Sequence, residues 1–517
     1  MELSRILEPV KIFGEKDNDA HRLDVRWKPS DEVTVDYAYD RSNMQETATY
    51  YQSTTPGPTT GIPQLDFLTA VVPHKKGRSD TGTAFNFPSH YADIESHSLI
   101  VNWELENMTI KSITAQRDSD YSANQDFSAG APFTLYFGGG ETEHKQFTQE
   151  LQFIGDAADS RFNYVAGFYY FEEEGDEITY NNSGTSNGYT IDNSAWALFG
   201  QGTYTPDGFD QKLHLTLGLR YSEDSREAEH INIAGGYDAE GDQDFDKVSG
   251  NLIVEYDLNE DASIYAKVVQ GYKTGGFGIR SSTPARFELG FEEENLMSYE
   301  VGYKAEFMDN RVRLNTAIFF SDYEDIQVTI PELLNPSITD VFNAGEAEIV
   351  GLEADLTAVV SEGLVLTASY GYLDTDIKEV IDPITGIDIT NDFVFPYAAE
   401  HSYRFDVDYT FPELSVGELS ANINYSWRDD SYQTGKASDA VRPQGGAIVD
   451  SYGLLDARLT LRGISLGDTG SLSIALWGKN LADKEHMATS MAAFPWSSQM
   501  AVWGEERSYG VDLSYEY

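Results

Sequence analysis

Strict alternation of apolar and polar residues is the strongest signal in this chain. Residues 212–222 read K-L-H-L-T-L-G-L-R-Y-S, with a leucine or tyrosine at every second position and Lys, His and Arg between them. Successive side chains of a strand point to opposite faces, so this segment is predicted to be a strand with one apolar and one polar face. A strand that separates lipid from water requires this pattern, whereas a buried soluble sheet rarely has it.

The last ten residues show the same alternation. Their apolar positions are Tyr509, Val511, Leu513, Tyr515 and Tyr517. The ends of soluble domains are usually loose and polar. A strand that ends on an aromatic residue is typical of an outer-membrane barrel, in which aromatic residues mark both membrane interfaces. We therefore predict that these five residues form the apolar face of a C-terminal membrane-insertion strand that ends in the periplasm.

Alternating segments recur along the chain, and we predict 19 strands between Ala20 and Tyr517. The links between them are alternately short, as at residues 29–31, and long, as at residues 41–91. Short periplasmic turns and long extracellular loops are typical of transmembrane barrels. A propeller would repeat every ~40–50 residues, and no such repeat is present. The predicted fold class is all-β: a transmembrane antiparallel β-barrel in the outer membrane of a Gram-negative bacterium.

Composition narrows the function classes. The sequence has no cysteine, which excludes disulfides and cysteine-ligated metal sites. The net charge of -51 opposes nucleic-acid binding, which needs a basic face. No apolar run of about 18 residues exists, so no transmembrane helix is predicted. The mean hydropathy of -0.41 is compatible with a membrane barrel, because only every second strand residue faces lipid.

A family resemblance rests on several motifs in one order. They include G-Y-K-T-G-G-F from Gly271, E-N-L-M-S-Y-E-V-G-Y-K-A-E-F from Glu294 and W-G-K-N-L-A-D-K from Trp477. With these motifs the chain, from about Ala20 onward, resembles the TonB-dependent outer-membrane receptors. That family has a barrel of 22 strands, so the resemblance implies that the 19 strands are strands 4 to 22. We expect residues 1–18 to be an N-terminal remnant or an outer-loop segment, and residues 19–517 to be the receptor-like barrel.

The resemblance implies uptake of a scarce nutrient, often a ferric siderophore, driven by TonB through an N-terminal plug. Neither a plug nor a secretion signal is visible, so we expect a fragment that would meet TonB only through an N-terminal part absent here. The closing strand should then pair with Ala20–Lys28 or with nothing. The alternative is a plugless, porin-like passive diffusion channel. Expected partners are outer-membrane lipid and lipopolysaccharide, the barrel-assembly machinery and a small ligand such as a ferric chelate, with no nucleic acid.

No catalytic motif, metal motif or cofactor motif is present, so the chain is not expected to be an enzyme. Residues 223–246 are predicted to be an acidic loop. Asp238, Glu240, Asp242 and Asp244 alternate as in a calcium loop, but Gln243 stands where that loop needs glycine. A solvated loop is the favoured interpretation, and low-affinity Ca²⁺ binding is the alternative.

Aromatic residues in the long links are the candidate ligand contacts. They are Tyr50, Tyr51, Phe85, Phe87, Tyr136, Phe137, Phe494 and Trp496. Loop packing or anchoring at the membrane interface explains them equally well. The residues of the family motif are assigned a structural role, in which the glycines let a strand bend into a long loop. They are Gly271, Tyr272, Lys273, Gly275, Gly276 and Phe277.

Overall fold

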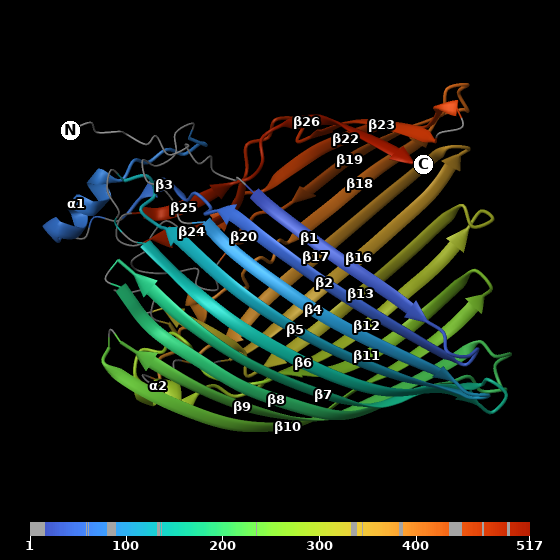
Figure 1. Ribbon diagram of the computed structural model, residues 1–517, viewed down its shortest axis with the longest axis horizontal. Helices are drawn as coiled ribbons and strands as arrows, with labels where there is room; N and C mark the ends of the chain where they lie inside the picture. Colours follow the sequence, from blue (N-terminus) through green and yellow to red (C-terminus); the bar gives the residue numbers. More distant parts are fainter. Residues whose placement is uncertain are drawn as a thin grey trace.

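A single curved sheet dominates the computed structural model of this chain (Figure 1). The structure describes residues 16–516, except residues 58, 60, 80–88, 132–134, 136, 183, 234, 332–338, 344, 382–385, 434–446, 468–469 and 494–496. The sheet has 19 strands and curves into the wall of a barrel. The prediction of an all-β antiparallel barrel with 19 strands is confirmed.

The strands of this wall follow one another in chain order. They are β1 (Lys16–Trp27), β2 (Val33–Thr47), β4 (Ser89–Glu104), β5 (Met108–Asp126), β6 (Phe137–Ala157), β7 (Phe162–Asn181), β8 (Gly184–Tyr204), β9 (Leu213–Asn232), β10 (Tyr237–Asn259), β11 (Ala262–Lys273), β12 (Glu294–Phe307), β13 (Val312–Glu324), β16 (Glu346–Ser361), β17 (Leu364–Glu379), β18 (His401–Thr410), β19 (Glu418–Arg428), β22 (Tyr452–Ser465), β23 (Ser471–Lys479) and β26 (Ser508–Glu516).

The remaining elements lie in the long connections at one end of the wall (Figure 1). They are the strands β3 (Gln52–Pro56), β14 (Gln327–Pro331), β15 (Thr339–Asn343), β20 (Ser431–Tyr432), β21 (Ile448–Val449), β24 (Met487–Ala493) and β25 (Ser497–Trp503), the helices α1 (Pro63–Val71) and α2 (Pro284–Leu289), and the 3-10 helix η1 (Thr390–Asp392). None of the described helices is long and apolar enough to cross a membrane.

Each wall strand pairs antiparallel with the next, and the wall has two edges. Within the described residues, β26 pairs in the wall only with β23, and β1 only with β2. The closing strand was expected to pair either with Ala20–Lys28 or with nothing. The described residues show no pairing between β26 and β1, the strand that contains most of that segment. The first strand begins at Lys16, a little before the expected start of the barrel at residue 19. Residues 1–15 and Tyr517 lie outside the described part.

The two faces of the wall differ as the alternation predicts. On β9, Leu217 and Leu219 point outward and are 54% and 56% exposed. Arg220, the residue after Leu219, points inward, and its guanidinium lies over the ring of Tyr169, 5.4 Å from the ring centroid. The apolar face can therefore lie against lipid while the polar face lines the lumen.

The C-terminal strand β26 shows the same division. Tyr509, Val511, Leu513 and Tyr515 are among the most exposed apolar side chains of the described residues. On the inner face, the Asp512 carboxylate pairs with Arg458 at 2.8 Å and accepts a hydrogen bond from the Trp477 indole at 3.0 Å. The strand thus presents apolar groups outward and a fully partnered charge inward.

The predicted acidic loop is wrong, because β9 and β10 continue as a hairpin to Asn232 and Tyr237. Glu174, Asp192, Glu227 and Asp242 lie directly opposite one another on β7, β8, β9 and β10, and all four point outward. We call this row the acid ladder. Among the described residues, no group of three His, Asp or Glu side chains is placed to hold a metal ion.

Candidate functional site

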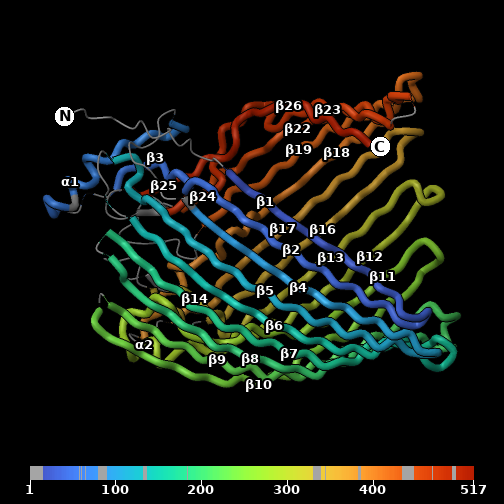
Figure 2. The backbone as a smooth tube through the Cα atoms, viewed as in Figure 1, coloured from blue at the N-terminus to red at the C-terminus, as the bar shows by residue number. Residues whose placement is uncertain are grey.

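Three clusters of buried apolar residues form at the end of the wall that carries the long connections. A one-layer wall between lipid and lumen has little interior of its own, so larger apolar side chains are buried mainly where loops fold over one another. In Figure 2 this end contains chain from both halves of the sequence. We call this end the mouth. It is extracellular, because short turns face the periplasm.

One of these clusters, the loop core, consists of Ala228, Ala239, Phe277 and Phe287. Phe287 lies on α2, which begins where the Thr283 hydroxyl accepts a hydrogen bond from the Arg286 amide. Its ring is fully buried, 5.5 Å from the ring of Phe277 and 5.2 Å from that of His230. The loop core therefore attaches the link after β11 to the extended hairpin of β9 and β10.

The motif G-Y-K-T-G-G-F positions Phe277, one of the four residues of the loop core. Gly271, Tyr272 and Lys273 end β11, and Gly276 forms an isolated bridge with Phe291, with two hydrogen bonds of 3.0 and 2.9 Å. A Cβ on Gly275 would lie 2.0 Å from the Phe291 carbonyl oxygen, so only glycine fits there. This close approach supports the structural role assigned to the motif and delivers Phe277 to the loop core.

A row of titratable groups runs beneath the loop core on the inner face. Glu177, Tyr189 and His230 lie opposite one another on β7, β8 and β9. Burial raises the pKa of Tyr189 to about 12, raises the pKa of Glu177 and lowers the pKa of His230. The Nε2 atom of His230 lies 3.3 Å from the side-chain oxygen of Asn187. The site therefore favours neutral histidine.

A second assembly joins the beginning and the end of the chain across the mouth. The strands β3, β25 and β24 form a three-stranded sheet, here called the mouth sheet. Within this sheet the buried hydroxyls of Ser53 and Ser497 lie 2.7 Å apart, and the Ser53 hydroxyl also contacts His74 Nδ1 at 2.6 Å. These hydrogen bonds tie the β2–β4 link to the β23–β26 link.

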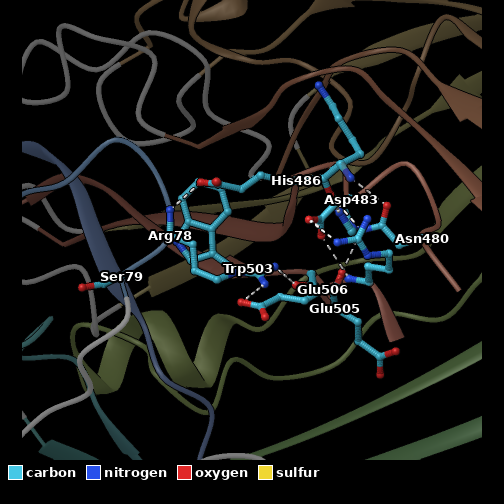
Figure 3. A network of polar contacts seen from close by, with 12 residues as sticks. Arg78, Ser79, Asn480, Asp483, His486, Trp503, Glu505 and Glu506 are labelled. Carbon is cyan, nitrogen blue, oxygen red and sulfur yellow. Dashed lines mark hydrogen bonds and ion pairs between the residues drawn. The ribbon is translucent and has the colours of Figure 1, made fainter. Parts of the chain in front are cut away.

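Charged and amide groups extend the mouth sheet (Figure 3). Arg78 pairs with Glu506 at 2.6 Å, and its guanidinium also donates a hydrogen bond to the carbonyl of Gly504. The side-chain oxygen of Gln52 accepts hydrogen bonds from the Ser79 amide at 2.8 Å and the Trp503 indole at 3.0 Å. Residues separated by more than 400 positions thus hold one another in a single polar network.

The candidate ligand-contacting aromatics are only partly placed. The ring of Tyr51 lies 5.6 Å from that of Phe127 in a tilted arrangement, and Tyr51 packs against the cluster of Val72, Ala129, Ala131 and Met500. Burial raises the pKa of Tyr50 and of Tyr51. Phe137 begins β6 and stacks on Tyr180 at 6.2 Å. Those that lie outside the described residues are Phe85, Phe87, Tyr136, Phe494 and Trp496.

The inner face of the wall is lined by paired charges. Lys267 pairs with Glu300 at 2.8 Å, and Arg404 with Asp406 at 2.7 Å. The Tyr265 hydroxyl adds a hydrogen bond to Glu300 at 2.7 Å. A polar inner face with partnered charges suits the passage of a hydrophilic solute. Wall, lumen and structured mouth define a class: a transport barrel of the outer membrane.

Comparison with known proteins identifies the family. Residues 26–481 match the family described as "TonB dependent receptor-like, beta-barrel". The chain belongs to this family, whose members are transport receptors rather than enzymes and which places it in the outer membrane of a Gram-negative bacterium. The resemblance inferred from the motifs is confirmed.

Curated relatives match over shorter segments. The probable TonB-dependent siderophore receptor PiuA of Acinetobacter baumannii is 26% identical over 171 residues, which are 32% of this chain and 22% of that protein. The pesticin receptor of Yersinia pestis is 29% identical over 173 residues, 33% of this chain and 24% of that protein. The alignments thus span about a quarter of the lengths of these relatives.

Solved structures match over almost the whole chain. The ferric yersiniabactin uptake receptor FyuA from Yersinia pestis gives a TM-score of 0.73 at 19% identity, covering 97% of this chain and 71% of that one. The siderophore receptor PiuA from Acinetobacter baumannii gives 0.70 at 17% identity, covering 97% and 74%. These structures share the fold of the present chain.

Sequence reasoning missed the mouth sheet and the loop core. Phe287 stands in a short segment without periodicity, so only the proline and threonine at the start of α2 could have indicated a helix there. Gln52, Ser53 and Ser497 lie in polar stretches that look like loops. Their pairing connects segments more than 440 residues apart, and no local pattern reports such a contact.

Proposed function

We propose that this chain forms the transmembrane wall and extracellular mouth of a receptor that imports a ferric siderophore or a similar scarce nutrient, with energy from TonB. The observation that carries the proposal is the family match over residues 26–481, on a wall whose mouth is built from packed loops. A structured mouth favours selective capture of a ligand, because pre-formed surfaces lose less conformational entropy on binding.

The chemical class of the ligand is inferred from the relatives. Proteins of similar structure include receptors for ferric yersiniabactin and ferric preacinetobactin and a transporter for ferric citrate. Such complexes are hydrophilic. They could pass along the inner face of the wall, whose charged side chains are already paired with one another. We propose ferric chelates as the class and assign no individual siderophore.

The roles of individual residues follow from the same proposal. The aromatics nearest the mouth, Tyr50, Tyr51 and Phe137, together with the other five candidates, stay proposed ligand contacts. Because Tyr50 and Tyr51 are partly buried, we propose that they also shape the surface that the ligand would meet. The division into residues 1–18 and 19–517, and the partners lipopolysaccharide and barrel-assembly machinery, also stay proposals.

A growth experiment tests the proposed function. The complete gene is expressed in a strain that lacks its own siderophore receptors, and iron-limited growth is scored on a panel of ferric siderophores, with and without TonB. Growth on one or a few ferric siderophores that requires TonB is the expected result. Equal growth on unrelated chelates without TonB, together with steady open conductance in a planar bilayer, would instead establish a passive channel.

A further inference from the structure

One arginine on the inner face of the wall has a charge that no carboxylate neutralises. The side chain of Arg220 on β9 is half-buried, and its Nε atom donates a hydrogen bond to the Ser222 hydroxyl at 2.9 Å. Within the described part of the chain, no carboxylate lies within ion-pair distance of this guanidinium, and its two terminal nitrogens have no hydrogen-bond partner. Lys267 and Arg404 on the same face each have an acidic partner. Arg220 therefore presents a free positive charge to the lumen.

Two aromatic rings hold this guanidinium in place. Its Cζ atom lies 5.4 Å from the ring centroid of Tyr169 and 5.9 Å from that of Phe199. The face of an aromatic ring attracts a cation, and a planar guanidinium stacks on it. A Cβ on Gly167 would lie 2.6 Å from the Phe199 ring, so glycine at this position of β7 lets the ring lie close to the wall. The guanidinium is thus oriented before a ligand arrives, which reduces the entropy lost on binding.

The acids nearest to Arg220 on the inner face are engaged by other groups. Asp224 is almost fully buried, accepts a hydrogen bond from the Tyr272 hydroxyl at 2.8 Å and lies 3.5 Å from Arg226. Glu150, which lies opposite Tyr169 on β6, accepts a hydrogen bond of 2.6 Å from a glutamine side chain of the same strand. These contacts leave the terminal nitrogens of Arg220 available to a ligand.

The position of Arg220 along β9 places it inside the lumen near the outer membrane interface. Tyr221, the next residue, points outward, and Glu223 is the first outward acid of the strand. A strand rises ~3.3 Å per residue and tilts by about 40° in a barrel, so Arg220 lies ~25 Å below His230 and the loop core. A solute captured at the mouth would therefore meet Arg220 after it has entered the lumen.

We propose that Arg220, Tyr169 and Phe199 form a lumenal subsite for an anionic group, such as a carboxylate, of the imported chelate. A guanidinium with free terminal nitrogens binds a carboxylate through two parallel hydrogen bonds. The net charge of -51 repels anions in general, so an uncompensated arginine is the kind of group that would attract one inward from the mouth. The inference rests on the proposed uptake of ferric chelates and adds the charge of the chelate and a place that holds it.

Isothermal titration calorimetry of the full chain in micelles tests the subsite. Ferric citrate is the anionic probe, and a neutral ferric trihydroxamate is the matched probe without a carboxylate. We expect Arg220→Gln to raise the dissociation constant for ferric citrate at least about tenfold, because two charge-assisted hydrogen bonds are lost. Arg220→Lys keeps the charge but not the planar fork, so its effect should be intermediate. Neither variant should change the affinity for the neutral chelate by more than about twofold.

Arg404→Gln is the matched control, because Arg404 also lies on the inner face but pairs with Asp406 at 2.7 Å. It should leave the affinity for ferric citrate within about twofold, whereas Phe199→Leu, which removes one ring face, should weaken binding about threefold. Heat-dependent gel mobility reports whether each variant forms the barrel. If R220Q does not, the affinities of R220K and F199L relative to the wild type decide the question.

Several results would overturn the subsite. They are no binding of ferric citrate to the wild type, unchanged binding in the Arg220 variants, equal losses for the charged and the neutral chelate, and an equal loss in R404Q. Weaker binding of R220Q in this chain but not in the complete protein would assign Arg220 to a carboxylate of the N-terminal part, and would also overturn it.

The titration also separates the subsite from the uptake on which it rests. Unchanged binding by R220Q, together with TonB-dependent uptake by cells, would reject the subsite and retain the proposed function. Binding of ferric citrate that requires Arg220, without uptake of any ferric chelate, would reject the proposed function and retain an anion site in the lumen.

Discussion

Phe287→Ala should lower the local stability of the mouth and leave the stability of the barrel wall unchanged. The Phe287 ring is fully buried among Phe277, His230 and Tyr189, with ring centroids 5.5, 5.2 and 6.2 Å away. Truncation of a buried phenylalanine costs about 3–5 kcal/mol, from lost transfer free energy and the cavity left behind. Because the loop core contacts only the mouth, the cost should fall on local opening of the segment around α2 and the β9–β10 hairpin.

Hydrogen exchange, followed by mass spectrometry on the full chain in micelles, measures this loss of local stability. The amides of Phe287, Gly290 and Phe291 donate backbone hydrogen bonds of 2.9–3.1 Å, so they are protected only while the segment is folded. We expect their protection to fall by at least about a hundredfold, since each 1.4 kcal/mol of local stability is tenfold. Amides in the membrane-spanning parts of β12 and β13 should not change.

The matched control is Leu289→Ala on the same helix. Leu289 is 67% exposed, so its truncation should change protection by less than about threefold. Unchanged exchange in F287A would refute the assignment of the loop core as the group that holds this segment. Loss of protection that spreads into the wall would refute the separation of mouth and barrel.

Further predictions concern the wall, the mouth sheet and pH. Leu513→Arg on the lipid face of β26 should cost about 2–4 kcal/mol in urea unfolding from vesicles, whereas L513I should cost under about 1.5 kcal/mol. Arg78→Ala, which removes the ion pair with Glu506, should cost about 1 kcal/mol locally and speed proteolysis of the β23–β26 link, and an unchanged cleavage rate would contradict this. Burial lowers the pKa of His230, so the unfolded mouth binds a proton more readily than the folded one. The hydrogen-exchange protection of the mouth amides should therefore be constant above pH ~6.5 and fall below it, by at most ~1.4 kcal/mol of local stability per pH unit. H230Q should abolish this fall.

The wall was predictable because each of its strands separates two solvents. Leu213 to Tyr221 alternate with polar residues because lipid and water impose opposite requirements on the two faces. Where β9 leaves the membrane after Tyr221, water lies outside, and acids such as Glu223 and Glu227 replace the leucines. The alternation then disappears although the strand continues, and this is why the hairpin was mistaken for a loop.

The mouth could not be predicted for a different reason. The contact between Ser53 and Ser497 depends on the curvature of the whole wall, which brings the first and last links of the chain to the same end. Likewise, Phe287 is buried only because the motif at Gly275 turns the chain back over β9 and β10. Local patterns determine a strand and its faces, but long-range packing determines which loop residues meet.

The acid ladder shows that this packing also tolerates unfavourable contacts. Directly opposed like charges destabilise a sheet by roughly 0.2–1 kcal/mol per pair, and four carboxylates stand in one row. They are exposed and screened by salt, so the backbone ladder of the hairpin outweighs the repulsion.

The central claim is that this barrel imports a ferric chelate with energy from TonB. Its most direct test is uptake of radioactive iron, supplied as a ferric siderophore, by cells that express the complete gene. We expect saturable uptake that disappears in a strain without TonB and weakens in cells that carry F287A in the mouth. Uptake that rises linearly with concentration and does not depend on TonB, or no uptake of any ferric chelate, would contradict it.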